Sequence, residues 1–446
     1  MNAPANLSFL AKALVILICA LWVLNVIQAL FPSQGLAQIL TVLLACTAII
    51  ALPQATASVK ILCGALVSIT VVLAHTYGKW EAIEVGLARA TIFPAFLATI
   101  VLLRATADQR REVSVARNLF TALDRERRDS GLVVGGFLIG SILQVGVFAI
   151  MAPILGRNAN ENERQEVFLA AMRGMALVPL WSPFVVGMAV TSQYLPQVLV
   201  WQIMLMGLGL SALCIILSII CFDRHGGLLA LWRSLQTLAP IAPSIAIAAL
   251  IVVGTAVSTG LSTLQSLVLA LPVPCLLAVY FSQGGSIPTA LKETSLRLTR
   301  IGPETTILTF ATVLGIVFES ALPDMGLLAW LQNLNLTPTI VIFVVITAMN
   351  LMGVMAIHSI VSGTILLVIF TNVSTGVSDL ILMQAVLVGW GLCTAVSLSS
   401  LSVVTGATMF EIPLTKALSW SNLVYAFLGG IICALILSAI NPVLVV

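Results

Sequence analysis

The chain has 446 residues, of which 60% are hydrophobic and only 8% are charged, and its formal net charge at pH 7 is +3. A soluble domain of this length needs far more charge on its surface, so the composition excludes one and indicates a multi-pass protein whose main partner is the lipid bilayer. Apolar runs of about 17 to 25 residues cross a bilayer as helices, and this scale predicts an all-α polytopic protein with about 10 to 11 transmembrane helices. The small net charge identifies no partner, and we expect no binding to nucleic acid.

The first half of the chain predicts a scaffold followed by a more polar membrane region. Residues 104–129 carry seven arginines among five acids, so we expect a cytoplasmic arm helix that lies on the membrane surface. Small residues over about 131–156 favour a re-entrant hairpin, or a span. We predict an N-terminal transmembrane helix in 1–35 and a first repeat over 36–237. In chain order, this repeat contains spans at 36–51, 59–74 and 89–103, the arm, the hairpin, a broken helix at about 166–193 and an unbroken span at 196–221.

A pair of prolines interrupts the apolar run 168–190 at Val-Pro-Leu-Trp-Ser-Pro-Phe, residues 178–184. Each proline removes a backbone donor and clashes with the preceding turn, so a helix cannot pass cleanly through both. We therefore expect two half-helices joined by unwound backbone near the bilayer midplane, where broken helices commonly form binding sites. The alternative is a proline kink within one continuous helix.

The second half, residues 238–446, repeats this order of elements. Its predicted elements are spans at about 238–259, 264–281 and 305–322, a charged loop at 282–300, an amphipathic piece at 324–336, a hairpin at about 337–371, a broken helix at about 380–410 and a closing span at 423–440. The second broken helix contains Ser-Leu-Ser-Ser-Leu-Ser at 397–402. Placing 182–186 over 400–404 brings the two irregular segments and their flanking elements into correspondence, so we predict two repeats.

Basic residues predict the orientation of these repeats. With the N-terminus inside, only Lys79 and Arg89 fall outside, and the other loop lysines and arginines are cytoplasmic, which agrees with the positive-inside rule. The first hairpin is then entered from inside and the second from outside, so the repeats are inverted. We expect a bacterial-type inner-membrane protein with a cytoplasmic N-terminus.

The order of arm helix, hairpin, broken helix and closing span, repeated with inversion, resembles the ion transporter superfamily. This superfamily includes divalent anion/sodium symporters, citrate permeases, arsenite pumps and the membrane subunits of TRAP transporters. The stretch most similar to it is 307–370, where a span ending in Glu319-Ser320 leads to a hairpin tip that reads Met-Ala-Ile-His-Ser at 355–359. In the symporters this tip is a Ser-Asn-Thr motif. The resemblance implies an elevator-type transporter, with a moving domain of hairpins and broken helices, and a homodimer.

Candidate binding residues lie at the two breaks and the two hairpin tips. An anion needs hydrogen-bond donors, which half-helix N-termini and unwound backbone supply without charged side chains. The residues that we expect to bind substrate are Gly140, Ser141, Pro179, Trp181, Ser182, Pro183, His358, Ser359, Ser397, Ser399, Ser400 and Ser402. Any single serine can instead satisfy backbone groups or serve as a small packing residue, and Trp181 can line the site or lie at a helix interface.

The coupling ion has two candidates, and no other cofactor is expected. His358 titrates near neutral pH and is the only titratable group at the second hairpin tip, so we expect it to couple proton movement to transport, with a neutral structural role as the alternative. Sodium can instead bind carbonyls and hydroxyls around Asn350, Ser359, Ser397 and Ser399. Arg173, in the first broken helix, either attracts an anion from the cytoplasmic mouth or extends to the membrane interface.

Motifs of enzymes are absent from the sequence, which has no HExxH, no GxSxG and no phosphate-binding loop, so we expect a protein that is not an enzyme. The eight cysteines show neither CxxC nor Cys/His ligand spacing, so we expect no metal site. Three functions remain: ion-coupled uptake of a small carboxylate-like anion, export of a toxic oxyanion or weak acid, and cation/proton antiport. The third is disfavoured because neither break contains an aspartate or glutamate. We expect an ion-coupled transporter of a small carboxylate-like anion, and the sequence does not separate uptake from export.

Overall fold

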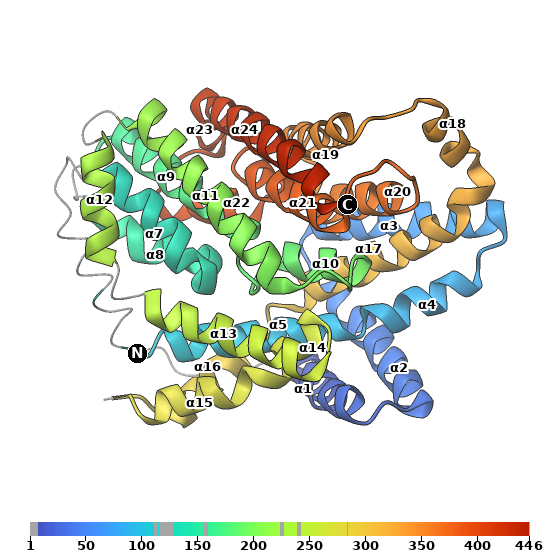
Figure 1. The fold of residues 1–446 in the computed structure, drawn as a ribbon. Helices are drawn as coiled ribbons and strands as arrows, with labels where there is room; N and C mark the ends of the chain where they lie inside the picture. The colour runs from blue at the N-terminus through green and yellow to red at the C-terminus, as the bar shows by residue number, and fades with distance from the viewer. Residues whose placement is uncertain are drawn as a thin grey trace. The chain divides into compact units, whose positions relative to one another are not determined.

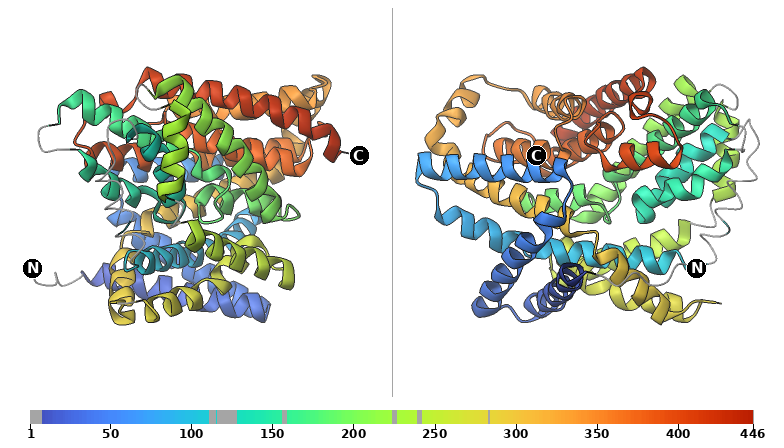
Figure 2. Two further views of the ribbon diagram at one scale, coloured as in Figure 1. Left: turned by 60° about the vertical axis from the view of Figure 1, so that its left-hand side comes forward. Right: turned by 180° about the vertical axis from the view of Figure 1, so that it is seen from behind.

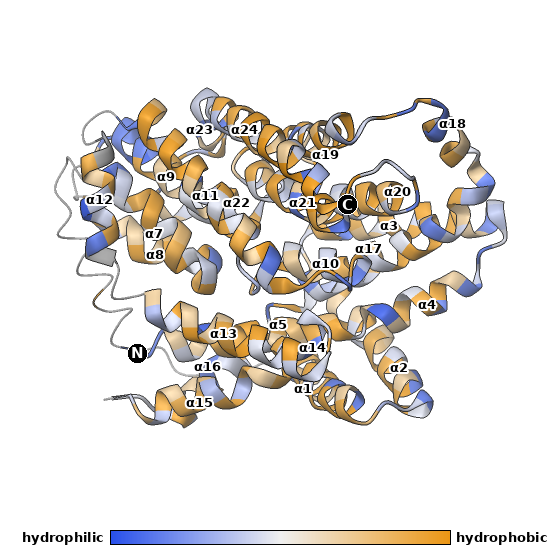
Figure 3. Ribbon diagram, in the orientation of Figure 1, coloured by the Kyte–Doolittle hydropathy of each residue, from blue (hydrophilic) through white to orange (hydrophobic). Residues whose placement is uncertain are grey.

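A computed structural model describes residues 8–110, 115, 128–155, 159–223, 227–238, 242–282 and 284–445. Every regular element within these residues is a helix. Ten of the described helical segments are long and apolar enough to cross a membrane, and Figure 3 shows hydrophobic residues along most of their length. The predicted class, an all-α polytopic membrane protein, is therefore confirmed.

The helices group into two compact units, and each unit takes segments from both halves of the chain. Unit 1 contains residues 1–109 and 254–329, and unit 2 contains residues 110–253 and 330–446. Both predicted hairpins and both predicted broken helices belong to unit 2. The predicted boundary between residues 237 and 238 divides the chain into two consecutive repeats. The grouping of helices into two units does not test that boundary.

Unit 1 has its core along α17 (Gly302–Ala321), which packs against α2, α3 and α4. Val313, Ile316 and Val317 of α17 form a buried apolar cluster with Ala74 of α3 and Ala82 of α4. The other elements of unit 1 are α1 (Phe9–Leu30), α2 (Gln34–Ala51), η1 (Leu52–Gln54), α3 (Ala57–Tyr77), α4 (Glu81–Ala90), α5 (Ile92–Ala107), α14 (Thr263–Ala270), α15 (Pro272–Tyr280), α16 (Ile287–Leu298) and η6 (Leu322–Met325) (Figure 1). The unit boundaries fall within α13 (Ala242–Thr259) and α18 (Leu327–Asn333).

Two predictions in unit 1 need correction, and one lies mostly outside the described residues. The span predicted at 89–103 is longer, because α4 and α5 follow one another from residue 81 to 107. The loop predicted at 282–300 contains α16, which begins because the Ser286 hydroxyl accepts a hydrogen bond from the Thr289 amide and Pro288 occupies the first turn. The predicted arm falls largely on 111–114 and 116–127, which the structure does not describe.

Unit 2 contains the order of hairpin, broken helix and long helix twice. The first set is α7 (Arg128–Leu143), η2 (Gln144–Gly146), α8 (Val147–Met151), η3 (Ala152–Ile154), α9 (Glu161–Met175), η4 (Val178–Leu180), α10 (Val186–Tyr194), α11 (Val200–Phe222) and α12 (Gly227–Leu238). The second set is α19 (Pro338–Val354), α20 (Ser359–Thr371), α21 (Asp379–Thr394), α22 (Leu401–Met409), α23 (Leu414–Ala417) and α24 (Trp420–Leu444). The long helix α24 packs along α19 and α21 (Figures 1 and 2).

Both hairpins reverse the chain at a left-handed residue that is not glycine. Gln144 has φ 48° and Ala356 has φ 59°. In the first hairpin the chain folds back so far that a methyl group added at Gly140 would lie 3.9 Å from Val147 Cγ1. The first tip therefore lies at Gln144, beyond the predicted Gly140 and Ser141. The same methyl group would lie 2.7 Å from Met175 Sδ, so Gly140 serves the close approach of α7 to α9 and not the turn.

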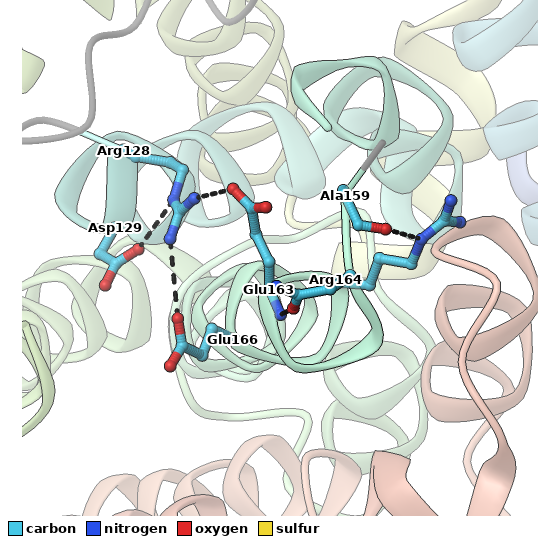
Figure 4. Close-up of polar contacts among 7 residues, drawn as sticks. Arg128, Asp129, Ala159, Glu163, Arg164 and Glu166 are labelled. Atoms are coloured by element: carbon cyan, nitrogen blue, oxygen red, sulfur yellow. Dashed lines mark hydrogen bonds and ion pairs between the residues drawn. The ribbon is translucent and has the colours of Figure 1, made fainter. Parts of the chain in front are cut away.

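The N-terminal ends of α7 and α9 are joined by the buried side chain of Arg128 (Figure 4). Its guanidinium lies 2.8 Å from the Glu163 carboxylate, 3.5 Å from Asp129 and 3.8 Å from Glu166. The helix α12, which the sequence analysis did not predict, also packs against α7, and the hydroxyls of Ser130 and Ser234 are 3.0 Å apart. The contacts of Arg128 hold α7 of the first hairpin and α9 of the first broken helix side by side, with their N-terminal ends together.

Candidate functional site

The first break separates α9 from α10 over residues 176–185, as the two prolines predict. Pro179 lies in the first turn of the 3-10 helix η4, and α10 begins only at Val186. The break keeps only short backbone turns, such as Trp181 N–H to the Val178 carbonyl at 3.3 Å, and no continuous helical ladder, so its remaining polar groups need other partners. The break is fully buried from Ala176 to Val185.

Side chains from two other elements bind the backbone of this break, and a side chain of the break binds the first hairpin. Gln384 of α21 donates from Nε2 to the Leu180 carbonyl at 3.0 Å. Gln144, at the first hairpin tip, donates from Nε2 to the Phe184 carbonyl at 2.7 Å. The Ser182 hydroxyl in turn donates to the Ser141 carbonyl at 3.1 Å. The break is thus held by its own hairpin and by the broken helix of the second repeat.

The closing helix α11 approaches the same backbone through Gly207. A methyl group built on Gly207 would overlap the Leu180 carbonyl oxygen, and it would lie 2.5 Å from the carbonyl carbon and 3.0 Å from Trp181 Cα. Only glycine fits this contact. The Leu180 carbonyl is therefore enclosed between α11 on one side and the Gln384 amide on the other.

Trp181 combines a packed ring with a free donor. Its ring centroid lies 5.4 Å from that of Phe137 in α7. Its indole N–H is buried and has no hydrogen-bond partner among the described residues. The ring thus belongs to the interface with the first hairpin, and the N–H is available to a ligand. A buried donor without a partner is costly unless something binds it.

The second break, residues 395–400, presents serine hydroxyls at the start of α22. Ser397 and Ser399 bond to each other through their hydroxyls at 2.8 Å. Ser400 is the N-cap residue of α22, with no capping hydrogen bond from its side chain, and Ser402 lies in the first turn. Ser399, Ser400 and Ser402 are partly exposed. These four serines have no described hydrogen bond to the predicted residues of the first repeat.

The second hairpin tip contains His358 in a capping role. Its Nδ1 accepts a hydrogen bond from the Ile360 amide at 3.3 Å, so the ring caps α20 directly before Ser359. Asn350 lies away from this tip, where Nδ2 donates to the Ala426 carbonyl of α24 at 3.5 Å. The structure therefore places Asn350 at the interface of α19 with α24 and does not bring it together with Ser397 and Ser399.

Each broken helix packs its second half on the hairpin of the other repeat. α10 contacts α20, and α22 contacts η2 and α8. This exchange brings the first hairpin tip beside α22 and the second hairpin beside α10. The half-helices α10 and α22, of nine residues each, begin directly after the two breaks, so each break lies at a helix N-terminus. Such helix ends stabilise negative charge.

Gln144 and Gln384 are the two residues of this region that the predicted site lacked. Gln384 is the only amide side chain in α21, a helix that is otherwise almost entirely apolar, and a lone amide within an apolar membrane helix usually bonds to a neighbouring helix. The sequence therefore contained a signal for Gln384. It did not reveal the hydrogen-bond partner of either glutamine, because each donates to a backbone carbonyl far along the chain.

No protein-family model and no curated protein matches the chain. Its fold is similar to that of the YdaH transporter of Alcanivorax borkumensis, a protein whose crystal structure reveals an unusual topology. The TM-score is 0.50, the sequence identity is 11%, and the match covers 90% of this chain and 98% of the other. At this identity the likeness shows that the chain has the fold of a membrane transporter, and no more.

Proposed function

We propose that the protein is a secondary active transporter, related to the ion transporter superfamily, that moves a small organic anion with a carboxylate-like group by elevator-type alternating access. The observation that carries this proposal is the first break, whose buried unwound backbone is held by Gln144 and Gln384 and includes the free Trp181 N–H. The described contacts of the break include no carboxylate, which favours an anion over a cation as ligand.

The grouping of helices supports the elevator mechanism. In such a mechanism one rigid body carries the substrate past another, so the hairpins and broken helices must belong to one compact unit. Both hairpins and both broken helices do fall in unit 2, and the core of unit 1 consists of the scaffold helices α3, α4 and α17.

Uptake into proteoliposomes tests the substrate class. We expect saturable uptake of at least one small carboxylate from a panel that also contains sulfonates and inorganic oxyanions. The Trp181→Phe variant keeps the aromatic packing but loses the N–H, so it should raise the half-saturating substrate concentration about tenfold. Trp330→Phe, on the exposed helix α18, is the matched control and should leave uptake unchanged.

Transport of sodium or protons without any dependence on an anion would contradict the proposal and favour an antiporter. Accumulation of an oxyanion or weak acid only in the outward direction would instead assign export.

We propose sodium as the coupling ion, because the capping bond at His358 requires Nδ1 without a proton. Protonation would break this bond and place a positive charge at the N-terminus of α20, where the helix dipole disfavours it. Asparagine is also a good N-cap residue but does not titrate. Uptake by His358→Asn should therefore stay within about threefold of the original protein and should require a sodium gradient. Uptake driven by a pH gradient alone, and lost in His358→Asn, would show that His358 couples protons.

A further inference from the structure

Arg173 is a buried cation whose close partners among the described residues are all neutral. It lies near the end of α9 and its side chain is almost completely buried, so it does not extend to the surface. Nε donates to the Ser218 hydroxyl of α11 at 2.9 Å, and Nη1 donates to the Asn422 amide oxygen of α24 at 3.2 Å. The guanidinium carbon lies 5.0 Å from the centre of the Phe222 ring. One arginine thus connects three helices from both repeats.

No carboxylate in the described part of the chain balances this charge at close range. Among the described residues, no ion pair within 4.0 Å includes Arg173, and the carboxylates of Asp129 and Asp223 act on it only from farther away. A buried charge is costly unless it is paired and fully hydrogen-bonded. The remaining guanidinium nitrogen, Nη2, donates to no described residue. Two of the three nitrogens therefore donate to neutral acceptors, and no described residue serves as a counter-ion.

Tyr425 supplies a second free donor beside this cation. It lies in α24, on the turn after Asn422, and its side chain is fully buried. Its ring packs edge-on against the same Phe222 ring, with 6.1 Å between centroids, and its hydroxyl has no hydrogen-bond partner among the described residues. Asn422 and Tyr425 lie in the first two turns of the 25-residue helix α24. The N-terminal end of a helix also favours negative charge.

We infer that Arg173 and Tyr425 bind a small monovalent anion, either an inorganic ion such as chloride or a free carboxylate such as formate. The anion neutralises the guanidinium, accepts a hydrogen bond from the Tyr425 hydroxyl and joins α9 to α24. This site is distinct from the first break, and its occupation stabilises unit 2 whether or not the protein transports the same ion.

Thermal unfolding of the purified full-length protein tests this site. The unfolding temperature is measured against chloride, nitrate and formate at constant ionic strength, with gluconate as the bulky replacement anion. An anion that binds only the folded state raises the unfolding temperature with its concentration. Stabilisation by chloride and nitrate alone identifies an inorganic ion, and stabilisation by formate identifies a carboxylate.

Tyr425→Phe is the most informative variant, because the hydroxyl that it removes has no partner within the described protein. In gluconate its unfolding temperature should equal that of the original protein or exceed it. The anion concentration that gives half of the stabilisation should rise about tenfold or more. Arg173→Gln should abolish the response to anions. The matched controls, Tyr280→Phe and Arg300→Gln, change exposed residues of unit 1 and should respond normally.

Two outcomes would overturn the inference. One is an unfolding temperature of the original protein that does not depend on the anion. The other is a Tyr425→Phe variant with the same anion dependence as the original protein. Either result would reduce Arg173 to a hydrogen-bonding link among the three helices, and the second remains measurable even if Arg173→Gln does not fold.

Discussion

Replacing Gly207 with alanine is expected to abolish transport and to lower the yield of folded protein severely. The new methyl group would overlap the Leu180 carbonyl oxygen and lie 2.5 Å from its carbon. That carbonyl cannot move freely, because it accepts the hydrogen bond from Gln384. Overpacking costs about 1 to 3 kcal/mol where side chains can adjust, and more where backbone must move. The gain in helix propensity, about 1 kcal/mol, does not compensate for this.

Gly209 provides the matched control two residues away on the same helix. A methyl group there meets no atom within 4 Å, so Gly209→Ala should keep full uptake and unfold at the same temperature or slightly higher. Size-exclusion profiles, unfolding temperatures and proteoliposome uptake of the two variants give the comparison. Equal behaviour of Gly207→Ala and Gly209→Ala would mean that α11 does not pack on the break as described.

The sequence predicts the first broken helix well, because its cause is local. Pro179 and Pro183 act on their own turn, so the interruption of the first broken helix follows from two residues and the length of the apolar run. The second hairpin is equally local, since its run is too long for one crossing. Its tip falls at 355–358, within the predicted 355–359. The ten membrane-length segments follow from composition and length alone.

The remaining features depend on contacts between distant segments. The first hairpin turns at Gln144, and α7 lies against Met175 of α9 at Gly140, before the turn. The residues near 140 do not reveal this contact with α9, so the sequence alone does not place the turn. Asn350 and Ser359 lie in neighbouring helices of one hairpin, yet only packing on α24 decides that Asn350 points away from the tip. The helices α12 and α16 are too short to cross a membrane, so a search for apolar runs does not find them.

Gln384→Leu is expected to lower the uptake rate by about tenfold or more, with a smaller effect on stability. Leucine has a similar size but cannot donate to the Leu180 carbonyl, which then stays buried without its partner at the centre of the first break. Losing such a partner costs about 1 to 3 kcal/mol. The substitution also removes Oε1, a buried acceptor that has no partner among the described residues, and this offsets part of the cost. We therefore expect the substitution to displace the Leu180 backbone, and so to lower the uptake rate, more than it lowers the stability of the fold.

Gln384→Glu separates the role of the amide donor from the role of shape. It keeps the side-chain geometry but places a carboxylate oxygen against the Leu180 carbonyl oxygen, where the amide donated before. Where the new carboxyl is ionised, repulsion between these acceptors and a negative charge beside the break should reduce anion uptake further than leucine does. Where burial keeps the carboxyl protonated, its O–H can donate to the Leu180 carbonyl, and uptake should be retained. Uptake and unfolding temperature of both variants, with Gln332→Leu on the exposed helix α18 as control, measure the two effects. If Gln384→Leu preserved uptake, the hydrogen bond from Gln384 to the Leu180 carbonyl would not be needed to hold the break.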